Sequence, residues 1–106
     1  MSNTPEGAVK DKIKAMLRTY KPHIYYFMPS MGAFGKSGVP DIIACVRGTF
    51  VAIEVKSDKN KNPPTALQEM NLYEISEAGG ISLVIDKHNI ASLAPLFDTL
   101  IERGSI

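Results

Sequence analysis

The sequence predicts an α/β protein in which a mixed β-sheet is flanked by helices. Apolar residues recur at helical spacing near the N-terminus and in two later segments. Four short runs rich in β-branched and aromatic residues lie between or beside them. The last two runs are joined through a helix, and such a crossover favours a parallel pair with a right-handed connection. The expected order is helix, three strands, helix, strand, helix.

The first helix is expected to start at Thr4, a good N-cap, with Pro5 where its missing N–H does no harm. It should end near Lys21-Pro22. Its apolar stripe consists of Val9, Ile13, Met16, Leu17 and Tyr20. Residues 23–28 (HIYYFM) then predict a strand, and a glycine-rich loop follows as far as Pro40.

A hairpin is predicted next, with strands from Asp41 to Val46 and from Thr49 to Lys56 around an Arg47-Gly48 turn. Arg47 is not the best first residue for such a turn. The pairing still follows from the two turn positions, because antiparallel partners then have numbers that add to a constant.

The second helix is expected to begin at Thr65, since Thr65 and Gln68 fit a capping box, and to stop at Gly79-Gly80. Residues 81–85 form a short apolar strand. From Asn89 an amphipathic tail is predicted, in which Pro95 divides a short turn from a last helix.

Length and composition describe one globular domain spanning residues 1–106, with 44% hydrophobic residues and a net charge of +1. No apolar run approaches the roughly 18 residues of a membrane span. The N-terminal stretch lacks the apolar core of a signal peptide, and Cys45 has no partner cysteine in the chain. We therefore expect an intracellular location, in the cytoplasm of a bacterial or virus-infected cell.

The predicted hairpin carries three charged residues, Asp41, Glu54 and Lys56, at positions where charge destabilises a simple hairpin. With Arg47 and Gly48 as the turn, Asp41 lies across from Glu54, and Lys56 points to the same face. Their Cβ atoms are then about 5 Å apart, where two full charges repel by about 3 kcal/mol at an effective dielectric near 20. That exceeds the benefit of an ordinary cross-strand pair, about 1 kcal/mol at most.

A divalent cation held between the two carboxylates offsets this repulsion. Oxygen-only ligands favour Mg²⁺ or Mn²⁺ over zinc. Such an ion beside Lys56 suits hydrolysis of a phosphodiester, with the lysine orienting the nucleophile or steadying the developing charge. The alternative is structural: Asp41 caps a strand start and Glu54 pairs with Lys56 at a wet sheet edge. Spacing alone leaves both open.

The motif resembles a known nuclease family. Pro40-Asp41 followed by Glu54-Val55-Lys56 resembles the PD-(D/E)xK signature. SGVPDII, FVAIEVKS, a glutamine at 68 and the GG before an apolar strand are similar to VRR-NUC domains, the virus-type replication-repair nucleases. The resemblance runs from Glu6 to Ile85. It implies a restriction-endonuclease-like core of order αβββαβα.

The resemblance also implies site roles and partners. Asp41, Glu54 and the Val55 backbone carbonyl are expected to hold Mg²⁺ or Mn²⁺, with Lys56 catalytic. The family is linked with branched, flapped or four-way junction (Holliday junction) DNA in repair, and stand-alone viral versions resemble proteins that act as homodimers. A metal-dependent DNA endonuclease is thus the leading hypothesis, and a non-catalytic nucleic-acid-binding or assembly module with the same fold is the alternative.

Two residues have both a site and a structural interpretation. Glu6 falls on the inward stripe of the first helix, where the family carries an acid that reaches toward the metal, although a first-turn acid is also favoured by the helix dipole. Gln68 matches a family glutamine near the site and equally a capping-box residue, and the two roles are compatible.

Four further residues are candidate DNA contacts: Lys36 and Ser37 in the loop before the hairpin, and Lys59 and Lys61 in the loop after Lys56. A lysine-rich loop is also common as a merely solvated surface.

Overall fold

The structure, a computed structural model, describes residues 3–30 and 36–104, so residues 31–35 of the predicted glycine-rich loop lie outside the described part. Four strands form one sheet in the order β1–β2–β3–β4. Neighbours are antiparallel except β3 and β4, which run parallel. The strands are β1 (Ile24–Phe27), β2 (Ile42–Val46), β3 (Thr49–Val55) and β4 (Ile81–Ile85). The predicted mixed sheet is confirmed.

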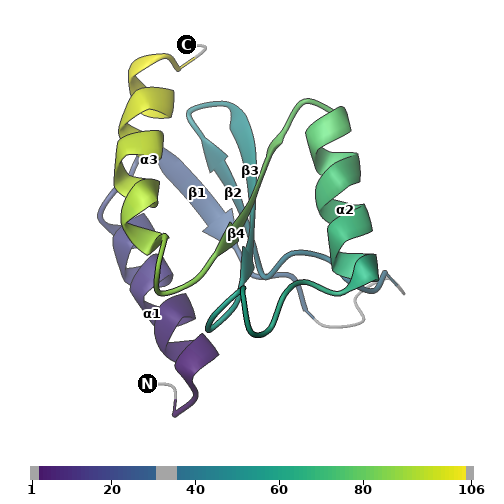
Figure 1. The fold of residues 1–106 in the computed structure, drawn as a ribbon. Helices are drawn as coiled ribbons and strands as arrows, with labels where there is room; N and C mark the ends of the chain where they lie inside the picture. The colour runs from purple at the N-terminus through teal and green to yellow at the C-terminus, as the bar shows by residue number, and fades with distance from the viewer. Residues whose placement is uncertain (1–2, 31–35, 105–106) are drawn as a thin grey trace.

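Helices cover both faces of the sheet. Helices α1 (Pro5–Arg18) and α3 (Leu93–Glu102) lie on one side, and α2 (Ala66–Glu77) lies on the other (Figure 1). The main core fills the space between α1, α3 and the sheet. Its fully buried members include Ile13, Leu17, Ile42, Val46, Val51, Ile53, Val55, Leu93 and Phe97.

The hairpin turn fixes the register of β2 against β3. Arg47 has φ 46° and Gly48 has φ 98°, and positive φ at both central residues matches the right-handed twist of the flanking strands. Pairing then runs from Val46↔Thr49 to Ile42↔Ile53. Alternate residues of β3 therefore face opposite sides, which buries Ile53 and Val55 against the α1–α3 side and turns Glu54 to the other.

Several predicted boundaries differ from the structure. The expected division at Pro95 is wrong, because α3 begins at Leu93 after a 3₁₀ turn (η2, Ile90–Ser92). Pro95 lies in the first turn of α3, where a backbone N–H would have no intrahelical partner in any case. Helix α1 ends at Arg18 rather than near Lys21, the residue before a proline, which disfavours helical backbone.

Both helix starts agree with the predicted caps. The Thr4 hydroxyl accepts the backbone N–H of Gly7, and Thr65 forms a complete capping box with Gln68. Within residues 3–30 and 36–104, no helix has the length and apolar character needed to cross a membrane.

Candidate functional site

The two predicted acids meet at the open end of the hairpin. Asp41 directly precedes β2, and Glu54 is the residue before the last in β3. Asp41 Oδ2 accepts the backbone N–H of Val55 at 2.8 Å, which draws its side chain across to β3. There the Asp41 side chain hydrogen-bonds the carboxyl group of Glu54. The structure therefore brings Asp41, Glu54 and Val55 together.

Lys56 lies one residue beyond β3, on the face of Glu54. Its backbone N–H donates to Ile85 O at 3.0 Å, which anchors the end of the strand to β4. Glu54 is only 2% exposed and Lys56 only 7%. Strand β3 has a neighbour on each side, so the alternative of a Glu54–Lys56 pair at a wet sheet edge is wrong.

The electrostatics of this pair are unfavourable without a cation. Burial, then the charge of Asp41 and the hydrogen bond to Asp41, raise the pKa of Glu54 to about 8, although Lys56 acts in the opposite direction. Oε1 of Glu54 is buried and has no hydrogen-bond partner among the residues that the structure describes. A buried carboxylate oxygen without a partner normally has an explanation.

A divalent cation fits these groups. Asp41 and Glu54 are neighbouring hard oxygen ligands, and Oε1 of Glu54 is a ligand atom that none of the described protein groups satisfies. A cation there removes the mutual repulsion that raises the pKa of Glu54.

Helix α1 contributes two charged side chains to this end of the hairpin. Glu6, in the first turn, is close enough for its charge to raise the pKa of Glu54 further. Lys10, one turn later, places its Nζ 3.5 Å from Asp41 Oδ1. Sequence reasoning missed Lys10. The spacing from Glu6 could have identified Lys10, because residues four apart on a helix share a face and Glu6 was already expected on the inward stripe.

Gln68 serves as a structural cap. Its Oε1 accepts the Thr65 backbone N–H at 2.9 Å, and the Thr65 hydroxyl accepts the Gln68 backbone N–H at 3.2 Å. A role of Gln68 in the site remains a prediction, as does that of the Val55 carbonyl.

The candidate DNA contacts divide into two groups. Lys36 and Ser37 are exposed, and Lys36 borders an apolar cavity of about 700 Å³ between α2 and the sheet, together with Phe27, Ile43 and Phe50. Lys59 and Lys61 lie in the loop that continues from Lys56. The structure does not bring the two groups into one cavity.

Lys61 borders a second hollow, of about 380 Å³. Lys12 of α1 and Lys87, which follows β4, also line it, and Ser57 joins it to Lys56. Three lysines from three separate segments therefore line this groove, whose lining begins at Ser57, directly after Lys56.

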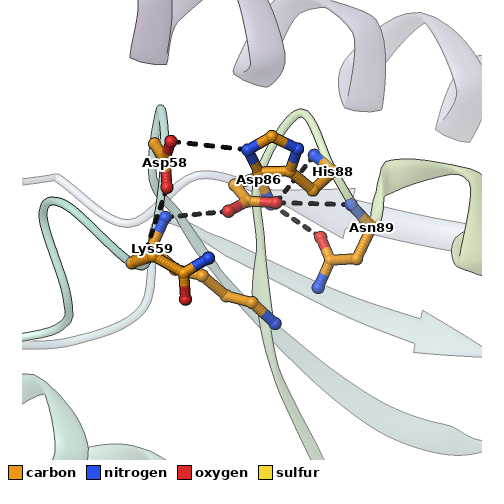
Figure 2. A network of polar contacts seen from close by, with 6 residues as sticks. Asp58, Lys59, Asp86, His88 and Asn89 are labelled. Atoms are coloured by element: carbon orange, nitrogen blue, oxygen red, sulfur yellow. Dashed lines mark hydrogen bonds and ion pairs between the residues drawn. The ribbon is translucent and has the colours of Figure 1, made fainter.

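A second acidic group, missed by sequence reasoning, lies beside this groove (Figure 2). Asp86 is fully buried, and its carboxylate accepts the backbone N–H groups of Lys59, His88 and Asn89. The Nε2 atom of His88 lies 3.4 Å from Asp58 Oδ2. We call Asp58, Asp86 and His88 the loop clasp, because they tie the loop after Lys56 to the end of β4. No local spacing signals it, since Asp58 and Asp86 are 28 residues apart.

The loop clasp is electrostatically satisfied. Hydrogen bonds from the backbone, that of Lys59 first, hold the pKa of Asp86 below its ordinary value. For Asp58, burial acts to raise the pKa, yet the Asn60 N–H and His88 bring it below normal. Ligand atoms of the three side chains lie within 4.8 Å of one another, so the described residues hold two acidic groups that could attract a divalent cation.

Comparison with known proteins supports a nuclease-family assignment. No family model matches the sequence, and no curated protein matches it. One solved structure, described as a VRR_NUC domain, is 26% identical, with a TM-score of 0.69, covering 93% of this chain and 96% of the other. Another, a VRR_NUC domain protein, shares the fold at 19% identity and a TM-score of 0.70, covering 93% and 92%. Together with the order of elements and the hairpin motif, these similarities support a VRR-NUC domain with a restriction-endonuclease-like α/β fold.

Proposed function

We propose that this protein is a metal-dependent endodeoxyribonuclease that hydrolyses phosphodiester bonds in branched, flapped or four-way junction DNA. One observation carries the proposal: the buried Glu54, with an unpartnered oxygen and a pKa raised to about 8, in contact with Asp41. Perturbed, desolvated acids beside a specific charge partner are typical of functional sites.

Asp41, Glu54 and the Val55 carbonyl would hold the ion, with Glu6 close by. When bound, Mg²⁺ or Mn²⁺ supplies Lewis acidity toward the phosphate and lowers the pKa of water. The hydrogen bond from the Val55 N–H keeps the Asp41 carboxylate turned toward Glu54. This preorientation means that the ligand oxygens need little rearrangement.

Lys56 would act as the catalytic cation. Its anchored backbone and its burial limit the positions open to its ammonium group. From there it can orient the attacking water or donate to a non-bridging phosphate oxygen as negative charge develops. Gln68, at the start of α2, would be a supporting polar group of the site in addition to its capping role.

The DNA backbone would run from the acid pair into the groove between α1 and the loop clasp. Lys61 and its neighbours Lys12 and Lys87 offer three ammonium groups to successive phosphates. Lys59, whose backbone is fixed by Asp86, extends the same loop. Lys36 and Ser37, exposed in the loop that leads to Asp41, would add further DNA contacts.

A homodimer would let two such sites address two strands of one branched substrate. The exposed aromatic side chains of Tyr25, Phe27 and Phe50 support this, since a small monomer rarely exposes several large apolar groups together. We place the protein inside the cell, because its one cysteine, Cys45, is free. Sedimentation that finds only active monomer at micromolar concentration would contradict the dimer.

The direct test is cleavage with Mg²⁺ or Mn²⁺ of linear, flapped, forked and four-way DNA of matched sequence. Glu54→Gln keeps the shape of the side chain and removes its charge, and the exposed Glu77→Gln is the matched control. We expect metal-dependent nicking of branched substrates by the wild type and by Glu77→Gln, and none by Glu54→Gln. DNA binding without cleavage in all three proteins would favour the non-catalytic module instead.

A further inference from the structure

We infer that Lys10 is an exchangeable counter-ion of the candidate metal site. Its ammonium group holds Asp41 while no divalent cation is bound, and it transfers to a DNA phosphate when a cation takes its place. The inference rests on the proposed function, because it concerns the same pair of acids. It assigns Lys10 as a positioning and substrate-binding residue.

The contact itself joins helix α1 to the hairpin. Lys10 Nζ lies 3.5 Å from Asp41 Oδ1, and the two side chains are 27% and 24% exposed. Lys10 and Asp41 are 31 residues apart in the chain. A partly exposed ion pair of this kind adds little to stability. The location of the Lys10–Asp41 ion pair beside Glu54 is therefore more informative about function than its contribution to stability.

Lys10 and a divalent cation would require the same oxygen. Asp41 Oδ2 is committed to the Val55 N–H at 2.8 Å. That leaves Oδ1 as the Asp41 oxygen available to a cation, and it is the one that the ammonium group of Lys10 approaches. A cation coordinated by Oδ1 and Glu54 would lie close to Nζ, and like charges at such a distance repel. Binding of the cation and retention of Lys10 on Oδ1 thus oppose each other.

Two lysines consequently flank the acid pair in different ways. Lys56 is 93% buried beside Glu54, within a strand end that is tied to β4. Lys10 is on a helix surface, with a long side chain that can swing without disturbing the core. Once a cation neutralises Asp41 and Glu54, the ammonium group of Lys10 no longer has a negatively charged partner at Asp41. A DNA phosphate entering the site supplies a new one.

The test measures metal affinity without DNA. Lys10→Met and the control Lys14→Met are titrated with Mn²⁺ by calorimetry. Lys14 lies one turn further along α1, is similarly exposed (31%), and pairs with Asp11 rather than with a site residue. Removing a positive charge beside a cation site tightens cation binding, so we expect Lys10→Met to bind Mn²⁺ on the order of tenfold more tightly than the wild type. Lys14→Met and Lys10→Arg should match the wild type.

A second readout is the salt dependence of DNA binding with the cation present. Loss of one phosphate contact should reduce the slope of log K against log salt by about 0.9 in Lys10→Met, and Lys14→Met should retain the wild-type slope. A purely structural role of Lys10 predicts neither tighter Mn²⁺ binding nor a smaller slope.

The two proposals fail in different ways. If Glu54→Gln abolishes Mn²⁺ binding while Lys10→Met binds Mn²⁺ no more tightly than the wild type, the counter-ion inference is overturned and the metal site stands. If the wild type binds no Mn²⁺, or Glu54→Gln binds it equally well, the proposed function itself is overturned.

Discussion

Two acidic groups, the Asp41–Glu54 pair and the loop clasp, lie at the ends of neighbouring strands and differ in how their oxygens are satisfied. In the loop clasp, backbone N–H groups approach both oxygens of Asp86, and its pKa is lowered. In the acid pair, Glu54 Oε1 is buried without a partner among the described residues, and the pKa of Glu54 is raised. Glu54 and Asp86 are both almost fully buried, so the difference lies in their partners: backbone N–H donors surround Asp86, whereas the charge of Asp41 adds to the effect of burial on Glu54.

The comparison separates a structural acid from a candidate catalytic one. Asp86 is stable as an anion because the protein supplies its donors, and it orders the loop that carries Lys59 and Lys61. The raised pKa of Glu54 means that this side chain favours a proton or a bound cation over the free anion. A buried carboxyl group thus stabilises a loop at Asp86, whereas at Glu54 it favours binding of a cation.

The largest expected effect is on cleavage. Glu54→Gln should lower Mg²⁺-dependent cleavage of branched DNA by a factor on the order of 10³ or more, because several kcal/mol of charge stabilisation are lost with a metal ligand. His88→Gln, which alters the loop clasp at an exposed side chain, should keep cleavage within a few-fold of the wild type. Equal losses in the two variants would erase the distinction between the groups.

The next effect is the pH dependence of metal-free stability. Since the pKa of Glu54 is raised to about 8, folded protein keeps a proton that the unfolded chain releases near the ordinary value of 4.5. Stability is therefore fully present below pH 4.5 and is lost as pH rises toward 8, with a slope of up to about 1.4 kcal/mol per pH unit. Urea denaturation in EDTA measures the slope, which should be largely absent in Glu54→Gln. A wild-type stability that rises over this range would contradict the assignment.

The contribution of the loop clasp to folding stability should change with pH in the opposite direction. The pKa of Asp86 is lowered, so its stabilisation is present above the ordinary Asp value and is lost as pH falls through the folded one. Asp86→Asn should lower the melting temperature by several degrees at pH 7, because the amide cannot accept from three N–H groups as the carboxylate does. Asp98→Asn, at an exposed position, is the control. An unchanged melting temperature in Asp86→Asn would contradict a structural role of the loop clasp.

The smallest effect concerns the groove. Lys61→Ser and Lys87→Ser should each reduce the salt slope of DNA binding by about 0.9, while the exposed Lys21→Ser leaves it unchanged. Fluorescence anisotropy with a fixed substrate measures the slopes. Identical slopes in all four proteins would mean that the DNA follows another path.

Most of the fold could be predicted because local signals agreed with one another. Thr4 and Thr65 mark helix starts through side-chain caps, and the Arg47-Gly48 turn sets a register that places Asp41 beside Glu54. These features depend on residues close in sequence. The predicted helix boundary at Pro95 was wrong, because proline breaks a helix in its interior but is tolerated in the first turn.

The long-range contacts could not be predicted from spacing. Lys10 reaches Asp41 only through the packing of α1 on the sheet, and Asp86 meets the Lys59 loop only because β4 lies next to β3. The burial of Glu54 also depends on its neighbour in β4, Val84, which lies 30 residues later in the chain. Sequence reasoning therefore located the acids but not the groups that decide their charge.

The central claim is that the acid pair, and not the loop clasp, is the cation site. Calorimetric titration of Mn²⁺ at pH 7 into wild type, Glu54→Gln and His88→Gln tests it most directly. We predict binding with release of about one proton in the wild type and in His88→Gln, because the cation displaces the proton of Glu54, and no binding in Glu54→Gln. Binding that survives in Glu54→Gln and disappears in His88→Gln would contradict the account.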